Sequence, residues 1–81
     1  MIYDTLTKRQ KEVIDYLIFG YSNDEISRIL HICYGRVSAL VYELYEKYKI
    51  YENDKRCRLM RARLEELGID FNKLTASKAV F

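Results

Sequence analysis

The sequence predicts an all-α domain made of four helices, and three observations support this fold class. Apolar residues recur at helical spacing in four separate segments. Polar residues of the kind that cap helices stand before several of these segments, and the chain contains no proline. Two of the three glycines, Gly20 and Gly68, fall where helical segments should end. With 81 residues, the chain is expected to form one small domain over residues 1–68 and a tail over residues 69–81.

The first expected helix covers residues 8–19 and packs through one apolar face. Thr7 and Gln10 have the spacing of a capping box at its start. Gly20 is expected to end it, because left-handed backbone is least costly for glycine. The predicted core-facing residues of this helix are Val13, Ile14, Leu17 and Ile18.

Residues 22–37 have the spacing of a helix-turn-helix motif. Its first helix is expected over residues 23–30, with Ser22 and Glu25 as a capping box. The turn follows at residues 31–33, and histidine at position 31 is a residue type that tolerates left-handed backbone. The predicted apolar stripe of this helix consists of Ile26, Ile29 and Leu30.

Two further positions fit the close packing that this motif requires. Ser27 is small enough for the two helices to approach, and Val37 can pack the second helix onto the first. The second helix of the motif, expected over residues 34–48, is the element that such motifs place in the major groove of DNA. The predicted core contacts from this part of the chain are Val37, Leu40 or Val41, Leu44, Tyr48 and Ile50.

The last expected helix covers residues 54–67, with Asn53 as its cap and Gly68 as its end. The tail after it contains several apolar residues, so it either packs against the body or provides a dimer surface. The predicted apolar stripe of the helix consists of Cys57, Met60, Leu64 and Leu67.

The formal net charge of +2 is small, but cations are concentrated in residues 55–63, which contain no acidic residue. This run is either a solvated helix face or an edge that contacts phosphates. Its members are Lys55, Arg56, Arg58, Arg61 and Arg63.

Composition also excludes several classes of protein. Cys33 and Cys57 lack metal-ligand spacing and are expected to be free, partly buried thiols in a reducing compartment. His31 is the one histidine, so a catalytic histidine pair is excluded, and no cofactor or small-molecule ligand is expected. The chain shows no signal peptide and no apolar run long enough to span a membrane, so the expected location is cytoplasmic.

Three segments resemble the LuxR-type (GerE-like) helix-turn-helix domain. They are L-T-K-R-Q-K-E-V at residues 6–13, G-Y-S-N-D-E-I at residues 20–26 and L-H-I at residues 30–32. The resemblance extends over roughly residues 6–67 and implies a four-helix, non-enzymatic DNA-binding domain of bacterial transcription regulators. It also implies that the third helix reads the major groove and that the fourth helps to form a dimer. Because the resemblance covers most of the chain, we expect a stand-alone, single-domain member.

The resemblance is closer in the scaffold than at the positions that would face DNA. The family usually caps the third helix with serine, where this chain has Cys33, a poorer acceptor. Its usual T-V-K triplet is replaced by Arg36, Val37 and Ser38. The glutamate usual in the first helix is Gln10 here.

The candidate DNA-binding residues fall into two sets. Arg36 can fork onto a guanine or a phosphate, although it could instead pair with Asp24. The residues expected to face base edges are Arg36, Ser38, Ala39 and Tyr42. The residues expected to contact the DNA backbone are Tyr34, Lys47, Lys8, Arg9, Lys55 and Arg56.

The leading hypothesis is a sequence-specific, double-stranded DNA-binding transcription regulator that acts as a homodimer. The alternative is a helix-turn-helix scaffold that binds another regulator or RNA polymerase. Glu43 favours the alternative, because beside the base-facing set it would repel phosphate unless it reads a cytosine or turns away. A set of aromatic residues, which are enriched in protein interfaces, also favours it: Tyr34, Tyr42, Tyr45, Tyr48 and Tyr51.

Overall fold

The computed structural model describes residues 1–69, which form a short 3-10 helix followed by four α-helices. The all-α prediction is therefore confirmed, whereas the predictions for the tail beyond residue 69 lie outside the described residues. The elements are η1 (Ile2–Thr5), α1 (Lys8–Ile18), α2 (Asn23–Leu30), α3 (Tyr34–Lys47) and α4 (Lys55–Glu66).

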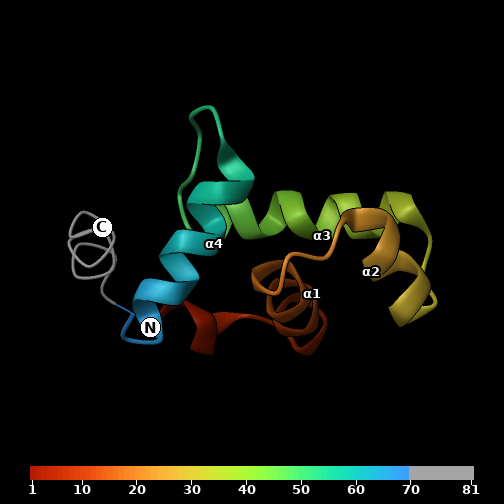
Figure 1. The fold of residues 1–81 in the computed structure, drawn as a ribbon, viewed down its shortest axis with the longest axis horizontal. Helices are drawn as coiled ribbons and strands as arrows, with labels where there is room; N and C mark the ends of the chain where they lie inside the picture. The colour runs from red at the N-terminus through yellow and green to blue at the C-terminus, as the bar shows by residue number, and fades with distance from the viewer. Residues whose placement is uncertain (70–81) are drawn as a thin grey trace, which may run out of the picture.

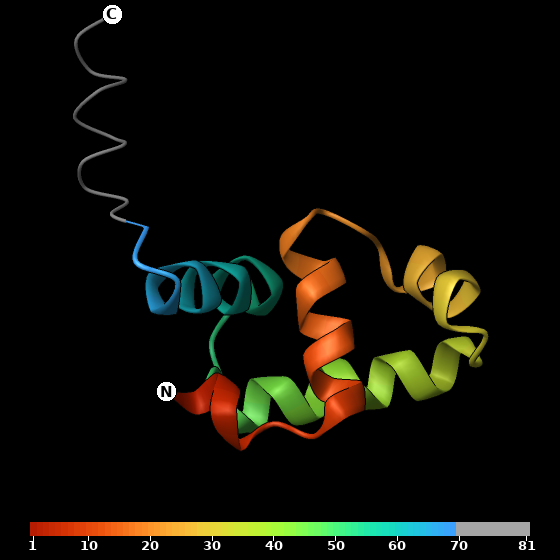
Figure 2. The same ribbon diagram turned by 90° about the horizontal axis from the view of Figure 1, so that it is seen from below.

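The helix α3 is the long element against which the others pack. α1 crosses it near its middle, with α2 on one side of α1 and α4 on the other (Figures 1 and 2). Their apolar faces meet in one core, where each predicted contact of the third helix is buried. The core consists of Leu6, Val13, Ile14, Leu17, Ile26, Val37, Leu40, Val41, Leu44, Tyr48, Ile50 and Leu59.

Both predicted capping boxes are present. In α1, the amide of Gln10 donates to Thr7 Oγ1 at 3.2 Å, and the amide of Thr7 donates to Gln10 Oε1 at 2.9 Å. In α2, the amide of Glu25 donates to Ser22 Oγ at 3.2 Å, and the amide of Ser22 donates to Glu25 Oε1 at 3.0 Å. These bonds satisfy amides that a helix start leaves without a partner, and they fix where both helices begin.

The residue that follows α1 and the turn of the motif have the predicted backbone conformations. Gly20 has a φ of 90° after α1, and His31 has a φ of 55° and a ψ of 42° after α2. Ser27 is buried between the helices, and its hydroxyl donates to the Asp24 carbonyl at 2.8 Å. A small side chain that satisfies its own hydroxyl lets α2 lie close to α3.

The prediction that Ile29 belongs to the buried stripe of α2 is wrong. Ile29 is 39% exposed, while Ile26 is fully buried and Leu30 is partly buried. The buried face of α2 is shared by Ile26 and Ser27, and Ile29 lies on the opposite side of Ile26 from Ser27. The prediction from apolar spacing alone centred the buried face too close to Ile29, because it did not include Ser27.

Two predictions for the last helix are also wrong. Its N-cap is Asp54, in left-handed backbone with no side-chain capping bond, rather than Asn53. Its inward face is formed by Leu59 and Arg63, whereas the predicted stripe included Cys57, which is exposed. The apolar spacing misplaced this face because the inward position at 63 is an arginine. Of the other predicted positions, Leu67 is exposed, and Met60 and Leu64 are partly buried.

A polar cluster joins the beginning of the chain to the end of α4. Glu66 Oε2 accepts from the amides of Ile2 at 2.8 Å and Tyr3 at 3.4 Å, and its Oε1 accepts from the Tyr48 hydroxyl at 2.6 Å. Arg63 lies 3.6 Å from the same carboxylate, with its guanidinium 3.5 Å above the centre of the Tyr3 ring. Burial and the bond to Glu66 raise the pKa of Tyr48. The position of η1 depends on this cluster, and η1 was not predicted from the sequence.

Candidate nucleic-acid interface

The side of α3 that faces away from α1 is open to solvent. Tyr34 is 55% exposed, Tyr42 is 59% exposed, and Arg36 and Ala39 are also exposed, while Ser38 is half-buried. In Figure 1 this side of α3 is the upper one, with α1 below the helix and the start of α4 rising above its C-terminal half. We call this side the exposed flank of α3.

The predicted base-facing residues are spread across this flank rather than aligned in one row. Arg36 and Ser38 are two positions apart, which is about 200° around a helix, so they lie on opposite edges of the flank. Ala39 and Tyr42 lie between them, near the centre. The centre therefore presents a methyl group and a phenol, with the carboxylate of Glu46 one turn beyond Tyr42, and the guanidinium of Arg36 stands at one edge.

Arg36 is exposed and is not paired with Asp24, the carboxylate suggested as its partner from the sequence. Asp24 is bound by Arg28, four residues later on α2. Within residues 1–69, the ion pairs and hydrogen bonds that hold Asp24 do not involve the Arg36 side chain. The guanidinium of Arg36 is therefore available to a ligand at the first turn of α3.

Glu43 is turned toward α1 by a hydrogen bond. Gln10 is only 5% exposed, and its Nε2 donates to Glu43 Oε1 at 3.0 Å. The same Gln10 amide group supplies the oxygen of the capping box in α1. This bond holds the carboxylate at the edge of α3 instead of the centre of the exposed flank, a role for Gln10 that the sequence reading missed.

The candidate backbone contacts lie on both edges of the exposed flank. Gln10 brings the first turn of α1, with Lys8 and Arg9, to the edge of α3 that carries Glu43. Helical spacing places Arg36 and Lys47 on this same edge. Lys8 and Lys47 are exposed, and Arg9 forms an ion pair with Glu12 at 3.2 Å.

The other edge carries Ser38 and Tyr45, and it is covered by the first turn of α4. Lys55 Nζ lies 5.9 Å from the centre of the Tyr45 ring, which orients the lysine along this edge. Burial raises the pKa of Tyr45. Thus cations from α1 and α3 border one side of the exposed flank, and a cation from α4 borders the other.

The remaining cations of residues 55–63 are divided among different environments. Arg56 donates to Asn23 Oδ1 at 2.7 Å and to a backbone carbonyl before α2. Arg63 is 7% exposed in the polar cluster, so it belongs neither to a solvated face nor to a phosphate-contacting edge. Residues 55–63 therefore do not form the single basic edge that was one of the two alternatives for this run.

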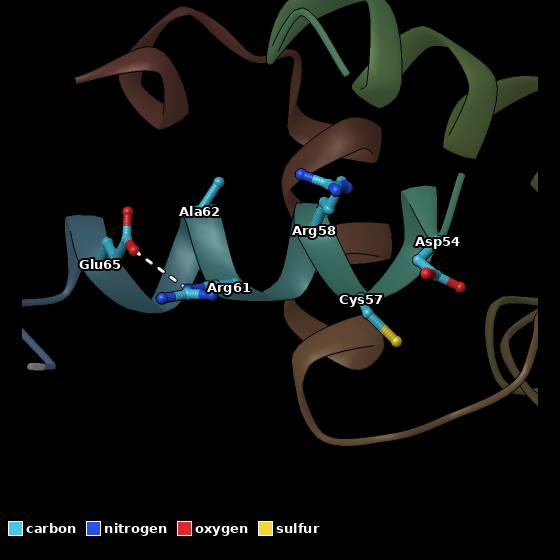
Figure 3. A pocket seen from close by; sticks show the side chains of 6 residues that line it. All are labelled: Asp54, Cys57, Arg58, Arg61, Ala62 and Glu65. Carbon is cyan, nitrogen blue, oxygen red and sulfur yellow. Dashed lines mark ion pairs between the residues drawn. The ribbon is translucent and has the colours of Figure 1, made fainter. Parts of the chain in front are cut away.

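Arg58 and Arg61 lie on the outer face of α4, together with the thiol of Cys57. Figure 3 shows this face as a shallow pocket, in which Arg61 pairs with Glu65 at 3.4 Å. Cys33 and Cys57 are free thiols, as predicted, but both are exposed rather than partly buried. As the N-cap of α3, Cys33 makes no side-chain capping bond, in keeping with the weak acceptor strength of a thiol.

Carboxylates border the C-terminal end of the exposed flank. A hydrogen bond to Glu46 raises the pKa of Tyr42, with a smaller contribution from Tyr51 in the loop between α3 and α4. This loop extends beyond α3 on the side opposite α1 (Figure 1), and it carries Glu52, which pairs with Arg58 at 3.2 Å. The N-terminal half of the flank is therefore the half that a polyanion can approach. The four-residue spacing of Tyr42 and Glu46 places them on one face of a helix, so this pair could have been predicted from the sequence.

The fold and this interface define the class of protein as a helix-turn-helix domain. A family model described as bacterial regulatory proteins, luxR family (GerE), matches residues 4–57, and the chain belongs to this family. It is thus a non-enzymatic domain of a family that binds DNA and regulates transcription. No curated protein and no solved structure matches the chain significantly. Among residues 1–69, no helix combines the length and apolar character that a membrane span needs.

Proposed function

We propose that this chain is a sequence-specific regulator that inserts the N-terminal half of α3 into the major groove of double-stranded DNA. The observation that carries the proposal is the arrangement of the exposed flank, with small Ala39 near its centre and cations along both edges. A helix in the major groove lies between two phosphate backbones, so cations on both edges can contact both strands.

Each predicted base-facing residue, and Tyr34, has a role in this arrangement. Ala39 faces the base edges, where its methyl group suits contact with a thymine methyl, and Tyr42 faces them at the C-terminal limit of the inserted half. Arg36 reaches a guanine or a phosphate from one edge, and half-buried Ser38 contributes its hydroxyl from the other. Tyr34 can donate a hydrogen bond to a phosphate at the start of α3.

The backbone contacts are proposed to come from both sides of α3. Lys8, Arg9 and Lys47 serve the strand beside Arg36, and Lys55 serves the strand beside Ser38. Such contacts supply affinity that depends on salt and not on sequence. Arg56 is the exception among the predicted residues, because its guanidinium is occupied by Asn23 and by the chain before α2.

We further propose that the active form is a homodimer. One helix reads few base pairs, and a second copy doubles the contacts at half-sites about one helical turn apart. Exposed Leu67 and Ile69 follow Glu66, which binds the amide of exposed Ile2, and these apolar residues give a surface at the end of α4. Sedimentation of the wild-type chain beside Leu67→Asp tests this: a dimer that becomes a monomer supports this surface, and two identical monomers contradict it.

The test of DNA binding is selection of duplexes from a random pool, followed by titration at several salt concentrations. We expect an enriched palindromic sequence, bound with an affinity that falls steeply as salt rises. An unselected duplex of equal length is the control for specificity. Equal affinity for selected and unselected duplexes would contradict sequence-specific binding.

A protein partner is the second candidate function, and the acidic end of the exposed flank favours it. Tyr42 and Tyr51 are both exposed there, beside the carboxylate of Glu46. Aromatic side chains with a polar rim suit a protein surface better than a phosphate backbone. The partner would be another regulator or RNA polymerase. Tyr51→Ala would then abolish capture of the purified partner and leave the affinity for DNA unchanged.

A further inference from the structure

The first turn of α4 holds the beginning of α2 through the side chain of Arg56. Arg56 Nη1 donates to Asn23 Oδ1 at 2.7 Å, and Nη2 donates to the carbonyl oxygen of Tyr21. Tyr21 and Asn23 stand on either side of Ser22, the N-cap of α2. Arg56 therefore binds the chain on both sides of the residue at which α2 begins.

We propose that Arg56 is a positioning residue for DNA recognition, which sets the orientation of α2 and, through α2, that of α3. The proposal rests on the DNA-binding function proposed above. α2 packs on α3, and its buried residues are Ile26 and Ser27, so a rotation of α2 about its start changes how α3 is presented to a groove. A guanidinium suits this role because its planar fork fixes two acceptors at once.

The geometry separates this role from a phosphate contact. Both terminal nitrogens of Arg56 are engaged with protein acceptors, so the fork that would grip a phosphate is directed at α2. The side chain is half-buried, whereas Arg58, two residues later, is exposed and bonded within its own loop. Arg56 thus links α4 to the motif, and Arg58 provides a matched control on the same helix.

The first test uses the free, full-length chain and measures amide hydrogen exchange. The informative amides are those of Glu25 and Ile26, which donate to Ser22 in the first turn of α2. We expect Arg56→Ala to speed their exchange by about tenfold, as the loss of a charge-assisted bond allows. Arg56→Lys, which reaches one acceptor at a time, should give an intermediate rate, and Arg58→Ala should match the wild type. Unchanged exchange in Arg56→Ala would overturn the proposal.

The second test measures binding to the selected duplex and to an unselected duplex over a range of salt. We expect Arg56→Ala to lower affinity for the selected duplex by about tenfold without changing the slope of log K against log salt. A slope reduced by about 0.9, with equal losses on both duplexes, would identify a phosphate contact and overturn the proposal. If the wild type binds no duplex, the DNA-binding function fails, and the exchange rates still decide whether Arg56 holds α2.

Discussion

Gln10 and Glu43 are joined by a 3.0 Å hydrogen bond from the Gln10 amide nitrogen to the Glu43 carboxylate. The oxygen of the same amide group accepts from the Thr7 amide at 2.9 Å, so one side chain serves the start of α1 and the edge of α3. The family usually has glutamate where this chain has Gln10. A glutamate here would keep the capping bond and bring a second carboxylate beside Glu43.

We therefore expect Gln10→Glu to lower the free energy of unfolding by about 1 kcal/mol at neutral pH, because two carboxylates would share a half-buried site. Repulsion between the new carboxylate at position 10 and Glu43 raises the pKa of the two groups in the folded state. The loss of unfolding free energy should therefore become smaller at acidic pH, where one of the two carboxylates is protonated. Urea denaturation at two pH values measures it. The double variant Gln10→Glu with Glu43→Gln restores one donor and should recover the stability; failure to recover would refute the explanation.

Arg36→Ala tests the edge of the exposed flank. We expect a loss of about 1–3 kcal/mol in binding free energy on the selected duplex, and relaxed preference at one base pair, since a bidentate contact to guanine is lost. Fluorescence anisotropy with single-base variants of the duplex measures both effects. Arg58→Ala removes an exposed arginine from the outer face of α4 and should leave base preference intact. Equal effects of the two substitutions would exclude a base-reading role for Arg36.

Glu46→Gln tests the acidic end of the flank. We expect tighter DNA binding by up to about 1 kcal/mol at low salt, the Coulomb energy of two unit charges about 4 Å apart in water. The gain should fade as salt is added, because exposed charges are screened. Glu65→Gln, on the outer face of α4, is the matched control and should leave affinity unchanged. Weaker binding of Glu46→Gln would mean that the carboxylate reads DNA.

The polar cluster at Glu66 predicts a stability effect. Glu66→Ala should destabilise the domain by about 3 kcal/mol, because it leaves the buried Arg63 guanidinium without its carboxylate. For a domain of this size, the melting temperature should fall by more than about 10 °C. Differential scanning calorimetry measures the fall. Glu65→Ala removes an exposed carboxylate from the same helical turn and should cost less than about 1 kcal/mol. Similar losses in the two variants would contradict a special role for Glu66.

Replacing Lys49, which has left-handed backbone, should increase stability. Lys49 has a φ of 54° directly after α3, in left-handed backbone that costs a residue with a Cβ about 1–2 kcal/mol. Lys49→Gly should therefore stabilise the domain by about 1 kcal/mol. Lys47→Gly, in the last turn of α3, should destabilise it by about 1 kcal/mol. Thermal unfolding measures both changes in stability. A gain for Lys49→Gly with a loss for Lys47→Gly supports the backbone explanation, and a loss of stability in both variants rejects it.

The sequence predicted most closely those features that depend on local chemistry. The capping boxes at Thr7 and Ser22, the end of α1 at Gly20 and the left-handed backbone at His31 are all set by neighbouring residues. The buried face of α3 was also predictable, because its apolar spacing is regular. These features are enough to define the helix-turn-helix and the fold class.

Features that depend on distant contacts were not predictable in the same way. Arg63 is buried because its guanidinium stacks on Tyr3 and faces Glu66, and residues 60 positions away in the chain supply part of that environment. A prediction based on apolar spacing treats Arg63 as a surface residue, and the inward face of α4 was misplaced for this reason. The orientation of Glu43 and the engagement of Arg56 likewise depend on side chains more than 30 positions away.

The cluster at Glu66 also affects where this domain can be cut. The family match spans residues 4–57, but Ile2 and Tyr3 are bound by a carboxylate nine residues beyond its end. A fragment trimmed to the matched span would lose Leu59 from the core and leave the Tyr48 hydroxyl without its acceptor. Subcloning by family boundaries would therefore remove two segments, residues 1–3 and residues 58–66, that hold each other in place.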